Sequence, residues 1–282
     1  MIGRLTIVGI GLLGGSVAKA VRARGAAREV IGVARNADRA RAAVDDGTLD
    51  RVTEDLAEGV RGADLVVLAA PVRTIEDLLE RMWSALPEDA IVTDVGSSKA
   101  AIVAKAEALA ANTPRTFLGS HPMAGSEKSG YAVARADLFQ GAVVVVTPTD
   151  ASEPRAVKAV TGFWELLGAR VVTLEPDAHD AAVAAISHLP HLVACALVDA
   201  VSREWPHALG VAARGFKDTT RIAAGDPTMW QEIFLANAAP LREALSSFRR
   251  ALDELERQIA AGDAALVEAT LARIKDAREK LA

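Results

Sequence analysis

Two polar blocks of this sequence combine the residue types that acid–base chemistry requires. The block TDVGSSK spans residues 93–99, and GSHPMAGSEKSG spans residues 119–130. Each block begins in or directly after a short apolar run, 91–94 or 116–119, of the kind that forms a buried strand. The second block contains His121, whose pKa ordinarily lies near working pH, so its imidazole is suited to accept a hydroxyl proton. An isolated histidine is more often structural, but the strand end and the neighbouring glycines favour a general base.

A glycine-rich turn near the amino terminus predicts a dinucleotide-binding site. The sequence GIGLLG at residues 9–14 follows an apolar run at 5–8, and a helix is expected over 13–24. Glycines at such a turn allow close approach of the backbone to a pyrophosphate, while free N–H groups at the helix start bind the anion. A merely structural turn is the alternative, but a second strand expected at 30–34 supplies the context of a nucleotide-binding unit. The cofactor-binding residues predicted here are Gly9, Gly11, Leu12, Leu13 and Gly14.

The choice between NAD and NADP depends on the residue that follows this second strand. NAD-selective proteins usually place Asp or Glu there, about 20 residues after the last glycine, to bind the ribose. This chain has Arg35 at that position, and its guanidinium could bind a 2′-phosphate. Asp38 lies close in the sequence and could still serve the ribose. The sequence therefore predicts an NAD(P) cofactor, with a modest preference for NADP.

The carboxy-terminal half contains a cationic pair that could bind a carboxylate. Lys217 and Arg221 are four residues apart and so share one face of a predicted helix. Arg221 could hold a carboxylate with two parallel hydrogen bonds. A solvated helix face is the alternative explanation, and for such a pair taken alone it is the commoner one.

The pattern of apolar runs predicts two domains. Over residues 1–174, short β-branched runs alternate with segments of helical period, which is typical of an α/β protein with a mostly parallel sheet. Over residues 175–282 strand signals disappear, so an all-helical domain is expected. Apolar residues near the carboxyl end predict either a helical hairpin packed within one subunit or a dimer interface.

Individual elements can be placed along this pattern. A capping box at Thr74–Asp77 predicts the start of one helix. Helix breaks are expected at Pro190, Pro206, 225–227 and 262–263. The predicted strands are 5–8, 30–34, 65–69, 91–94, 116–119, 142–147 and 170–174.

Composition and charge exclude several classes of protein. Lys and Arg number 32 against 37 Asp and Glu, a net charge of −5, which is the wrong sign for bulk capture of nucleic acid. Hydrophobic residues make up 51% of the chain, so it can bury cores and is not disordered. Ala181–Val198 has the length of a membrane span, but His188 and Pro190 at mid-depth argue against one. We expect a soluble, cytoplasmic protein with its one cysteine, Cys195, as a small core residue.

These blocks, in this order, resemble the prephenate dehydrogenase family of tyrosine biosynthesis. The matching segments are GIGLLGGS, TDVGSSK, GSHPMAGSEKSG, ISHLPH, GFKDTTRIA and DPTMW, and the likeness covers nearly the whole chain. The resemblance implies a Rossmann-type domain followed by a helical domain that dimerises, so a homodimer is expected. It implies oxidative decarboxylation of prephenate to 4-hydroxyphenylpyruvate and CO2, with hydride transfer to NAD(P)+. No metal, nucleic acid or membrane is expected as a partner.

The resemblance also implies roles for single residues. His121 resembles the catalytic histidine that accepts the proton of the ring hydroxyl. Ser97 resembles the serine that bonds this histidine and the nicotinamide end of the cofactor. The residues expected around the substrate are Arg221 as carboxylate ligand, Lys217 and Glu127 as a charged pair at the entrance, His191 as a second histidine, and the aromatic Trp230.

Two alternatives remain open at this stage. Arogenate or cyclohexadienyl dehydrogenases act on closely similar substrates, although the second histidine of HLPH and the Glu-Lys of SEKSG are more typical of the prephenate type. Arg35 departs from the acidic residue of NAD-dependent members. An alternative of a different class is a dinucleotide-sensing regulator without turnover. The presence together of His121, Ser97 and Arg221 argues against it, because a sensor needs no base beside the nicotinamide.

Overall fold

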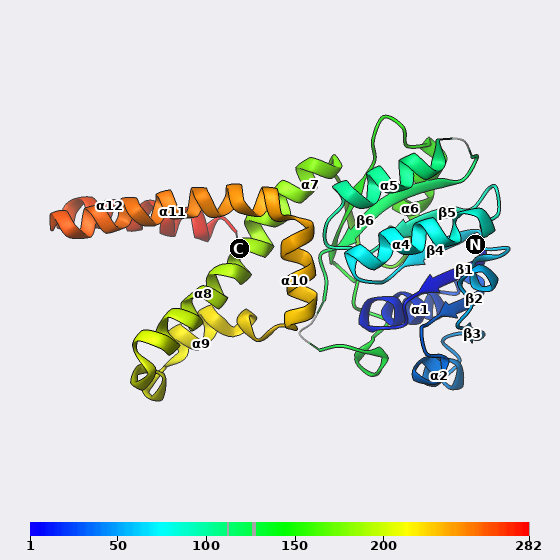
Figure 1. Cartoon of the computed structure of the whole chain (residues 1–282), viewed down its shortest axis with the longest axis horizontal. Coiled ribbons are helices and arrows are strands. Elements are labelled where there is room, and N and C mark those ends of the chain that lie inside the picture. The colour runs from blue at the N-terminus through cyan, green and yellow to red at the C-terminus, as the bar shows by residue number, and fades with distance from the viewer. Residues whose placement is uncertain (112, 126–127, 282) are drawn as a thin grey trace.

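The computed structural model describes residues 1–111, 113–125 and 128–281. Within these residues an α/β domain with an eight-stranded sheet precedes an all-helical domain, so the predicted fold class is confirmed (Figure 1). The strand order is β3-β2-β1-β4-β5-β6-β7-β8, and of the neighbouring pairs only β6 and β7 run antiparallel. The strands are β1 (Ile2–Val8), β2 (Ala27–Val33), β3 (Arg51–Thr53), β4 (Leu65–Leu68), β5 (Ile91–Asp94), β6 (Thr116–Pro122), β7 (Val143–Thr147) and β8 (Arg170–Thr173).

The predicted strands are present, and the structure adds β3 at one edge of the sheet. This strand was missed because it has three residues, Arg-Val-Thr, and only the valine among them is apolar. Its register comes from pairing with β2, where Ile31 lies opposite Arg51. A strand of this length has no periodicity that a sequence pattern could reveal.

Both faces of the sheet are covered by helices, as buried parallel strands require. One apolar cluster joins the sheet to α1 and α6, and a second joins it to α3, α4 and α5. The helices of this domain are α1 (Leu12–Arg24), α2 (Ala37–Asp45), α3 (Leu56–Val60), α4 (Val72–Met82), α5 (Ala100–Ala110) and α6 (Pro154–Leu166), with short 3-10 turns η1 (Trp83–Ala85) and η2 (Tyr131–Val133).

The predicted start of α4 at the Thr74–Asp77 capping box is wrong. The helix begins at Val72, and Pro71 occupies the N-cap position with φ −56° and ψ 151°. Proline sets this φ by its ring and lacks the N–H that the position would leave unpaired, so the helix starts two residues before Thr74. Val72 and Ile75 are thereby buried against the sheet.

The second domain is helical throughout its described residues and projects away from the sheet (Figure 1). Its helices α11 and α12 run side by side out to the end of the molecule, and α10 packs against α4 of the first domain. The predicted breaks at Pro206, 225–227 and 262–263 are confirmed. The elements are α7 (Pro176–Val183), the π-turn η3 (Ala184–His188), α8 (Leu189–Glu204), η4 (Pro206–Val211), α9 (Arg214–Thr220), η5 (Arg221–Ala224), α10 (Pro227–Ala236), α11 (Ala238–Ala261) and α12 (Ala264–Glu279).

The predicted break at Pro190 is wrong. Pro176–Glu204 is one continuous helix, in which a π-turn over Ala184–His188 directly precedes the proline. A proline inside an α-helix clashes with the carbonyl four residues before it and leaves a hydrogen bond unmade. The wider π-turn takes up this mismatch locally, which lets the helix continue past Pro190.

The helix Pro176–Glu204 is, by length and composition, able to cross a membrane, and 28% of its apolar window is buried within the described chain. Cys195 lies on this helix and is half-buried, so its prediction as a core residue is wrong. Burial of this degree still raises the pKa of its thiol. The apolar stretch around Cys195 is therefore only partly buried in the single chain.

Candidate active site

The turn after β1 has the backbone that a dinucleotide site requires. Gly9 has φ +99°, and a Cβ there would lie 2.2 Å from the carbonyl oxygen of Ala69. A Cβ on Gly14 would lie 1.9 Å from the carbonyl oxygen of Gly9, whereas one on Gly11 would meet no atom within 4 Å. Helix α1 also has no side-chain cap, so its first N–H groups remain available to an anion. The residues present therefore fit the pyrophosphate of NAD(P)+.

The residues after β2 leave a cation next to this turn. Arg35 lies two residues after the end of β2 and is exposed. Asn36 is occupied as the N-cap of α2, where its side chain accepts from the N–H of Arg39 at 3.1 Å. Asp38 is exposed in the first turn of the same helix. Nothing in these contacts distinguishes NAD from NADP, so the modest preference for NADP stays a prediction.

The strands β1, β4, β5 and β6 are parallel neighbours, so their carboxyl ends share one edge of the sheet. Gly9 follows β1, Ser97 follows β5, and His121 is the residue before the last of β6. This is the edge at which an open α/β sheet binds its ligands. The fold therefore brings both predicted catalytic residues to the same edge as the glycine turn.

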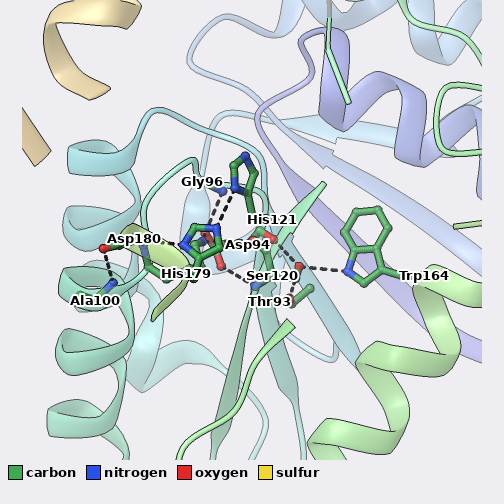
Figure 2. A network of polar contacts seen from close by, with 10 residues as sticks. Thr93, Asp94, Gly96, Ala100, Ser120, His121, Trp164, His179 and Asp180 are labelled. Carbon is green, nitrogen blue, oxygen red and sulfur yellow. Dashed lines mark hydrogen bonds and ion pairs between the residues drawn. The ribbon is translucent and has the colours of Figure 1, made fainter. Parts of the chain in front are cut away.

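The backbone that carries His121 is fixed by a buried network around Ser120 (Figure 2). The N–H of Ser120 donates to Asp94 Oδ1 at 3.1 Å, and its hydroxyl donates to the Asp94 carbonyl at 2.6 Å. Trp164 Nε1 donates to the Ser120 hydroxyl at 2.9 Å from the opposite side. Because these groups are fully buried, the end of β6 has little freedom to move relative to β5.

A buried ion pair completes this support. The side chains of Lys99 and Asp94 are 0% exposed and form a salt bridge. Lys99 Nζ also donates to the carbonyl oxygen of Ser120 at 3.1 Å. Desolvation lowers the pKa of Lys99, although its contacts with Asp94 oppose the shift. Both residues belong to the TDVGSSK block, but neither was assigned a role from the sequence.

His121 makes its ring contact with a residue of the second domain (Figure 2). Its Nδ1 lies 2.9 Å from Nε2 of His179 on α7, and His179 Nδ1 lies 2.8 Å from Asp180 Oδ1. Asp180 in turn accepts from the N–H groups of Lys99 at 2.7 Å and Ala100 at 3.0 Å, at the start of α5. The amino-terminal and carboxy-terminal halves of the chain thus meet at His121.

Sequence reasoning missed His179 and Asp180. A usable signal was present, because the chain has five histidines and one of them stands beside a carboxylate at the domain junction. The partner of that pair lies 58 residues earlier, and no local pattern predicts the contact.

The surroundings of His121 favour its neutral form. Burial, followed by the nearby His179, Lys99 and His188, holds the pKa of His121 well below its usual 6.5. Burial also lowers the pKa of His188 to about 4, against the opposing influence of Asp180. Both rings are therefore uncharged at neutral pH, the state in which an imidazole can accept a proton.

Two of the residues expected around the substrate lie together in the helical domain. The rings of His191 and Trp230 stack with centroids 3.5 Å apart and planes at 11°. A Cβ on Gly225 would come within 2.5 Å of Trp230 Nε1, so glycine is needed for this packing. Burial lowers the pKa of His191, and its Nδ1 has no hydrogen-bond partner among the described residues. The stacked pair thus offers a neutral, unpaired nitrogen.

Asn237 connects this stacked pair to the His121 contacts. Its Nδ2 donates to the carbonyl oxygen of Asp180 at 2.8 Å and lies 3.1 Å from His188 Nδ1. The ring of His188 meets that of Trp230 edge-on, with centroids 6.3 Å apart. Four of the five histidines of the chain therefore belong to one connected region.

Among the contacts of the described residues, none joins Lys217 or Arg221 to His121. Lys217 is exposed near the end of α9, and Arg221 is exposed at the start of η5, beside α8. Ser97 is half-buried after β5. Glu127 lies outside the described residues. The substrate roles of these residues stay predictions, and the described residues contain no cluster of His, Cys, Asp and Glu that could hold a metal ion.

Comparison with known proteins agrees with this geometry. The family model "Prephenate dehydrogenase, nucleotide-binding domain" matches residues 17–173, and "Prephenate dehydrogenase, dimerization domain" matches residues 175–273. Prephenate dehydrogenase of Bacillus subtilis is 33% identical over 98% of this chain and 76% of its own length.

Two solved structures extend the likeness to the whole fold. Prephenate dehydrogenase of Aquifex aeolicus, in complex with hydroxyphenyl propionate and NAD+, is 35% identical with a TM-score of 0.93, covering 100% of this chain and 99% of its own. Arogenate dehydrogenase of Synechocystis is 33% identical with a TM-score of 0.87, covering 99% and 100%. With both domains matched in order and the glycine turn and His121 at one sheet edge, the chain belongs to the prephenate dehydrogenase family.

Proposed function

We propose that this protein is a prephenate dehydrogenase, which converts prephenate to 4-hydroxyphenylpyruvate and CO2 with hydride transfer to NAD(P)+. The observation that carries the proposal is the neutral ring of His121 at the sheet edge that also carries the glycine turn. Oxidation of a secondary alcohol needs a base for the hydroxyl proton at the place where the hydride leaves. A cofactor sensor without turnover has no use for such a base.

The proposed reaction assigns one proton transfer to His121. Bound NAD(P)+ supplies the acceptor for the hydride that leaves the ring carbon bearing the hydroxyl. His121 Nε2 accepts the hydroxyl proton as the carbonyl forms, because its Nδ1 is already bonded to His179. The bond to the ring carboxylate then breaks, its electrons pass through the ring to the oxygen, and His121 returns the proton to that oxygen. Restored aromaticity drives the loss of CO2. No proton is released to solvent, because the proton that His121 takes from the hydroxyl returns to the same oxygen.

The remaining residues are proposed to orient the substrate. Arg221 would bind a carboxylate, Lys217 and Glu127 would flank the entrance, and His191 with Trp230 would contact the side chain. Ser97 would bond the nicotinamide end of the cofactor beside His121, whose two ring nitrogens are assigned to His179 and to the substrate.

Absorbance of the reduced cofactor tests the proposal directly. We expect turnover with prephenate that exceeds turnover with arogenate. Preference for arogenate would instead assign the alternative substrate, which the likeness to an arogenate dehydrogenase makes the second candidate. Turnover of neither, with binding of cofactor retained, would support a sensor. His121→Asn should reduce kcat by about 10²- to 10⁴-fold, the range for loss of a general base, with cofactor affinity largely kept.

We further propose that the cofactor is NADP+ in preference to NAD+. Support comes from Arg35, which is exposed after β2 while Asn36 is used as a helix cap. A charge-assisted hydrogen bond to the 2′-phosphate is worth about 1.5–3 kcal/mol, so Arg35→Asp should weaken NADP+ by about 10- to 100-fold. Arg28→Asp, an equal charge change at the exposed start of β2, is the control. Unchanged NADP+ use by Arg35→Asp would refute this role.

A homodimer is proposed on the basis of exposed apolar residues. Ile259 on α11 is 69% exposed, and Leu271 on α12 is 53% exposed. The matching family model describes this region as a dimerization domain. The apolar helix Pro176–Glu204 also carries His179 and His188, whose rings are bonded to protein groups. We therefore assign this helix to contacts with protein and not with lipid, and propose a soluble, cytoplasmic enzyme. Sedimentation analysis measures the subunit number.

A further inference from the structure

The ring of His121 is one end of a hydrogen-bonded series that crosses the two domains (Figure 2). The series runs from His121 Nδ1 to His179 Nε2 at 2.9 Å, and from His179 Nδ1 to Asp180 Oδ1 at 2.8 Å. His179 is 0% exposed and Asp180 is 4% exposed, so water does not compete for these contacts. Each nitrogen in the series must therefore be either a donor or an acceptor towards its neighbour.

Asp180 fixes the direction of the series because it is ionised. Burial alone would raise its pKa, but hydrogen bonds from His179 and from the N–H groups of Ala100 and Lys99 lower the pKa below its usual value. Those two N–H groups begin helix α5, where a carboxylate is favoured by the helix dipole. An ionised carboxylate can only accept, so His179 Nδ1 must carry a proton.

The protonation of the next ring follows from this. An imidazole with a single proton, placed on Nδ1, presents a lone pair at Nε2, so a singly protonated His179 accepts there. His121 Nδ1 must then donate to it, which leaves His121 Nε2 without a proton. The opposite arrangement would direct a lone pair of His179 Nδ1 at the carboxylate of Asp180, so the contact between these two side chains would have no hydrogen bond.

We propose that His179 and Asp180 are positioning residues of the reaction, which hold His121 in its Nδ1–H tautomer so that Nε2 is free to take the substrate proton. The inference rests on the proposed function and names two residues that act through His121. The same hydrogen bond serves before and after proton transfer, since an imidazolium at His121 still donates from Nδ1. The carboxylate of Asp180, one ring away, stabilises the positive charge while His121 holds the proton.

Other charged and titratable groups around His121 do not replace this pair. The side chains of Lys99 and Asp94 are bonded to each other and to backbone groups of Gly96 and Ser120. His188 is bonded to Asn237. None of these three side chains has a hydrogen bond to the His121 ring among the described contacts.

The tautomer can be measured without substrate. In protein with isotope-labelled histidine near neutral pH, nitrogen chemical shifts distinguish a protonated from an unprotonated ring nitrogen, and His121→Asn identifies the His121 signals by their loss. We expect wild-type His121 as the Nδ1–H form. A wild-type His121 that is mainly Nε2–H overturns the proposal.

Variants at position 179 separate positioning from structural support. His179→Leu removes the acceptor for His121, whereas His179→Gln offers a side-chain oxygen at a similar reach, and both leave Asp180 to cap α5. We expect His179→Leu to move His121 to the Nε2–H tautomer and to lower kcat by about 10- to 100-fold, the effect of one charge-assisted hydrogen bond. His179→Gln should recover most of this loss and keep the Nδ1–H form, while cofactor affinity changes in neither variant.

The control is His207→Leu, the same substitution at an exposed histidine of η4, which should leave both rate and tautomer unchanged. Equal losses in the Leu and Gln variants, or an unchanged tautomer in His179→Leu, would assign His179 a structural role and overturn the inference. If wild type turns over neither prephenate nor arogenate, the proposed function fails, but the tautomer measurement still decides the role of His179. The wild-type spectrum remains decisive even where a variant does not fold.

Discussion

Replacement of Lys99 by methionine tests how the catalytic strand is supported. Lys99 and Asp94 are both 0% exposed, and methionine fills a similar volume without the charge. The change removes the ion pair and the hydrogen bond to the carbonyl of Ser120, the residue before His121. It leaves the Asp94 carboxylate buried beside β6.

The expected cost follows from what remains around Asp94. Removal of one partner of a buried ion pair costs about 3–5 kcal/mol, because the other charge is left uncompensated. Asp94 keeps hydrogen bonds from the N–H groups of Gly96 at 2.8 Å and Ser120 at 3.1 Å. We therefore expect Lys99→Met to lose about 3 kcal/mol, near the lower end of that range. The double variant with Asp94→Asn should lose less than the sum of the two single changes.

Urea unfolding of the holoprotein and of the protein without cofactor measures the effect. The control is Lys105→Met on α5, the helix that Lys99 precedes; it removes an exposed pair with Glu80 and should cost much less than Lys99→Met. A loss for Lys99→Met no larger than that of Lys105→Met would refute the reasoning. So would strict additivity with Asp94→Asn.

The same variant has a predicted effect on the pH profile. His121 must be unprotonated to act as a base, so kcat/KM is lost as pH falls through its pKa. Burial, His179 and Lys99 hold that pKa well below 6.5, so the acid limb of the wild type should lie well below pH 6.5. Loss of the Lys99 charge raises the pKa of His121, so the limb should move towards higher pH. A limb that stays in place would show that Lys99 does not influence His121.

Three further predictions concern other parts of the molecule. Gly11→Ala should keep the wild-type unfolding midpoint, because its Cβ would meet no protein atom. It should weaken cofactor binding at least about tenfold, because this Cβ stands where the helix start binds the pyrophosphate. Gly9→Ala, whose Cβ would collide with the Ala69 carbonyl, should also lower the unfolding midpoint, and equal midpoints for the two variants would contradict this reasoning. In the folded state the pKa of His188 is about 4, compared with the usual 6.5, so the unfolded chain binds more protons between these two pH values. In urea titrations the free energy of unfolding of the wild type should therefore fall by about 2 kcal/mol between pH 7 and pH 5, relative to that of His188→Gln. Ile259→Asp should shift sedimentation from dimer towards monomer, and an undisturbed dimer would place the interface elsewhere.

The sequence was informative wherever a feature depends on neighbouring residues. Alternation of apolar runs with helical segments predicted the sheet and the helical second domain, because burial on two faces or on one stripe leaves a period in the chain. The glycine turn at 9–14 could be read from spacing, since a positive φ and a close backbone approach admit few other residues. His121 could be found because its strand end and its glycines are adjacent to it.

Local pattern failed where two distant segments decide the outcome. The proline at 190 does not end its helix, because a π-turn precedes it, and that turn lies against α11, about 50 residues further along the chain. Cys195 has apolar neighbours in the sequence yet is half-buried, because consecutive residues of a helix point to different sides and only one side faces the rest of the described chain.

The sequence alone thus determined the fold class, the nucleotide turn and the histidine at the sheet edge. Tertiary structure alone decided which groups surround that histidine: Asp180, from the second domain, caps a helix of the first and orients His179 against His121. The physical reason is that hydrogen bonds depend on distance in space, and 58 residues of chain separate these two rings while folding brings them to 2.9 Å. Periodicity in the sequence shows which side of an element is buried, but it does not show which distant polar residue a side chain on that element will contact.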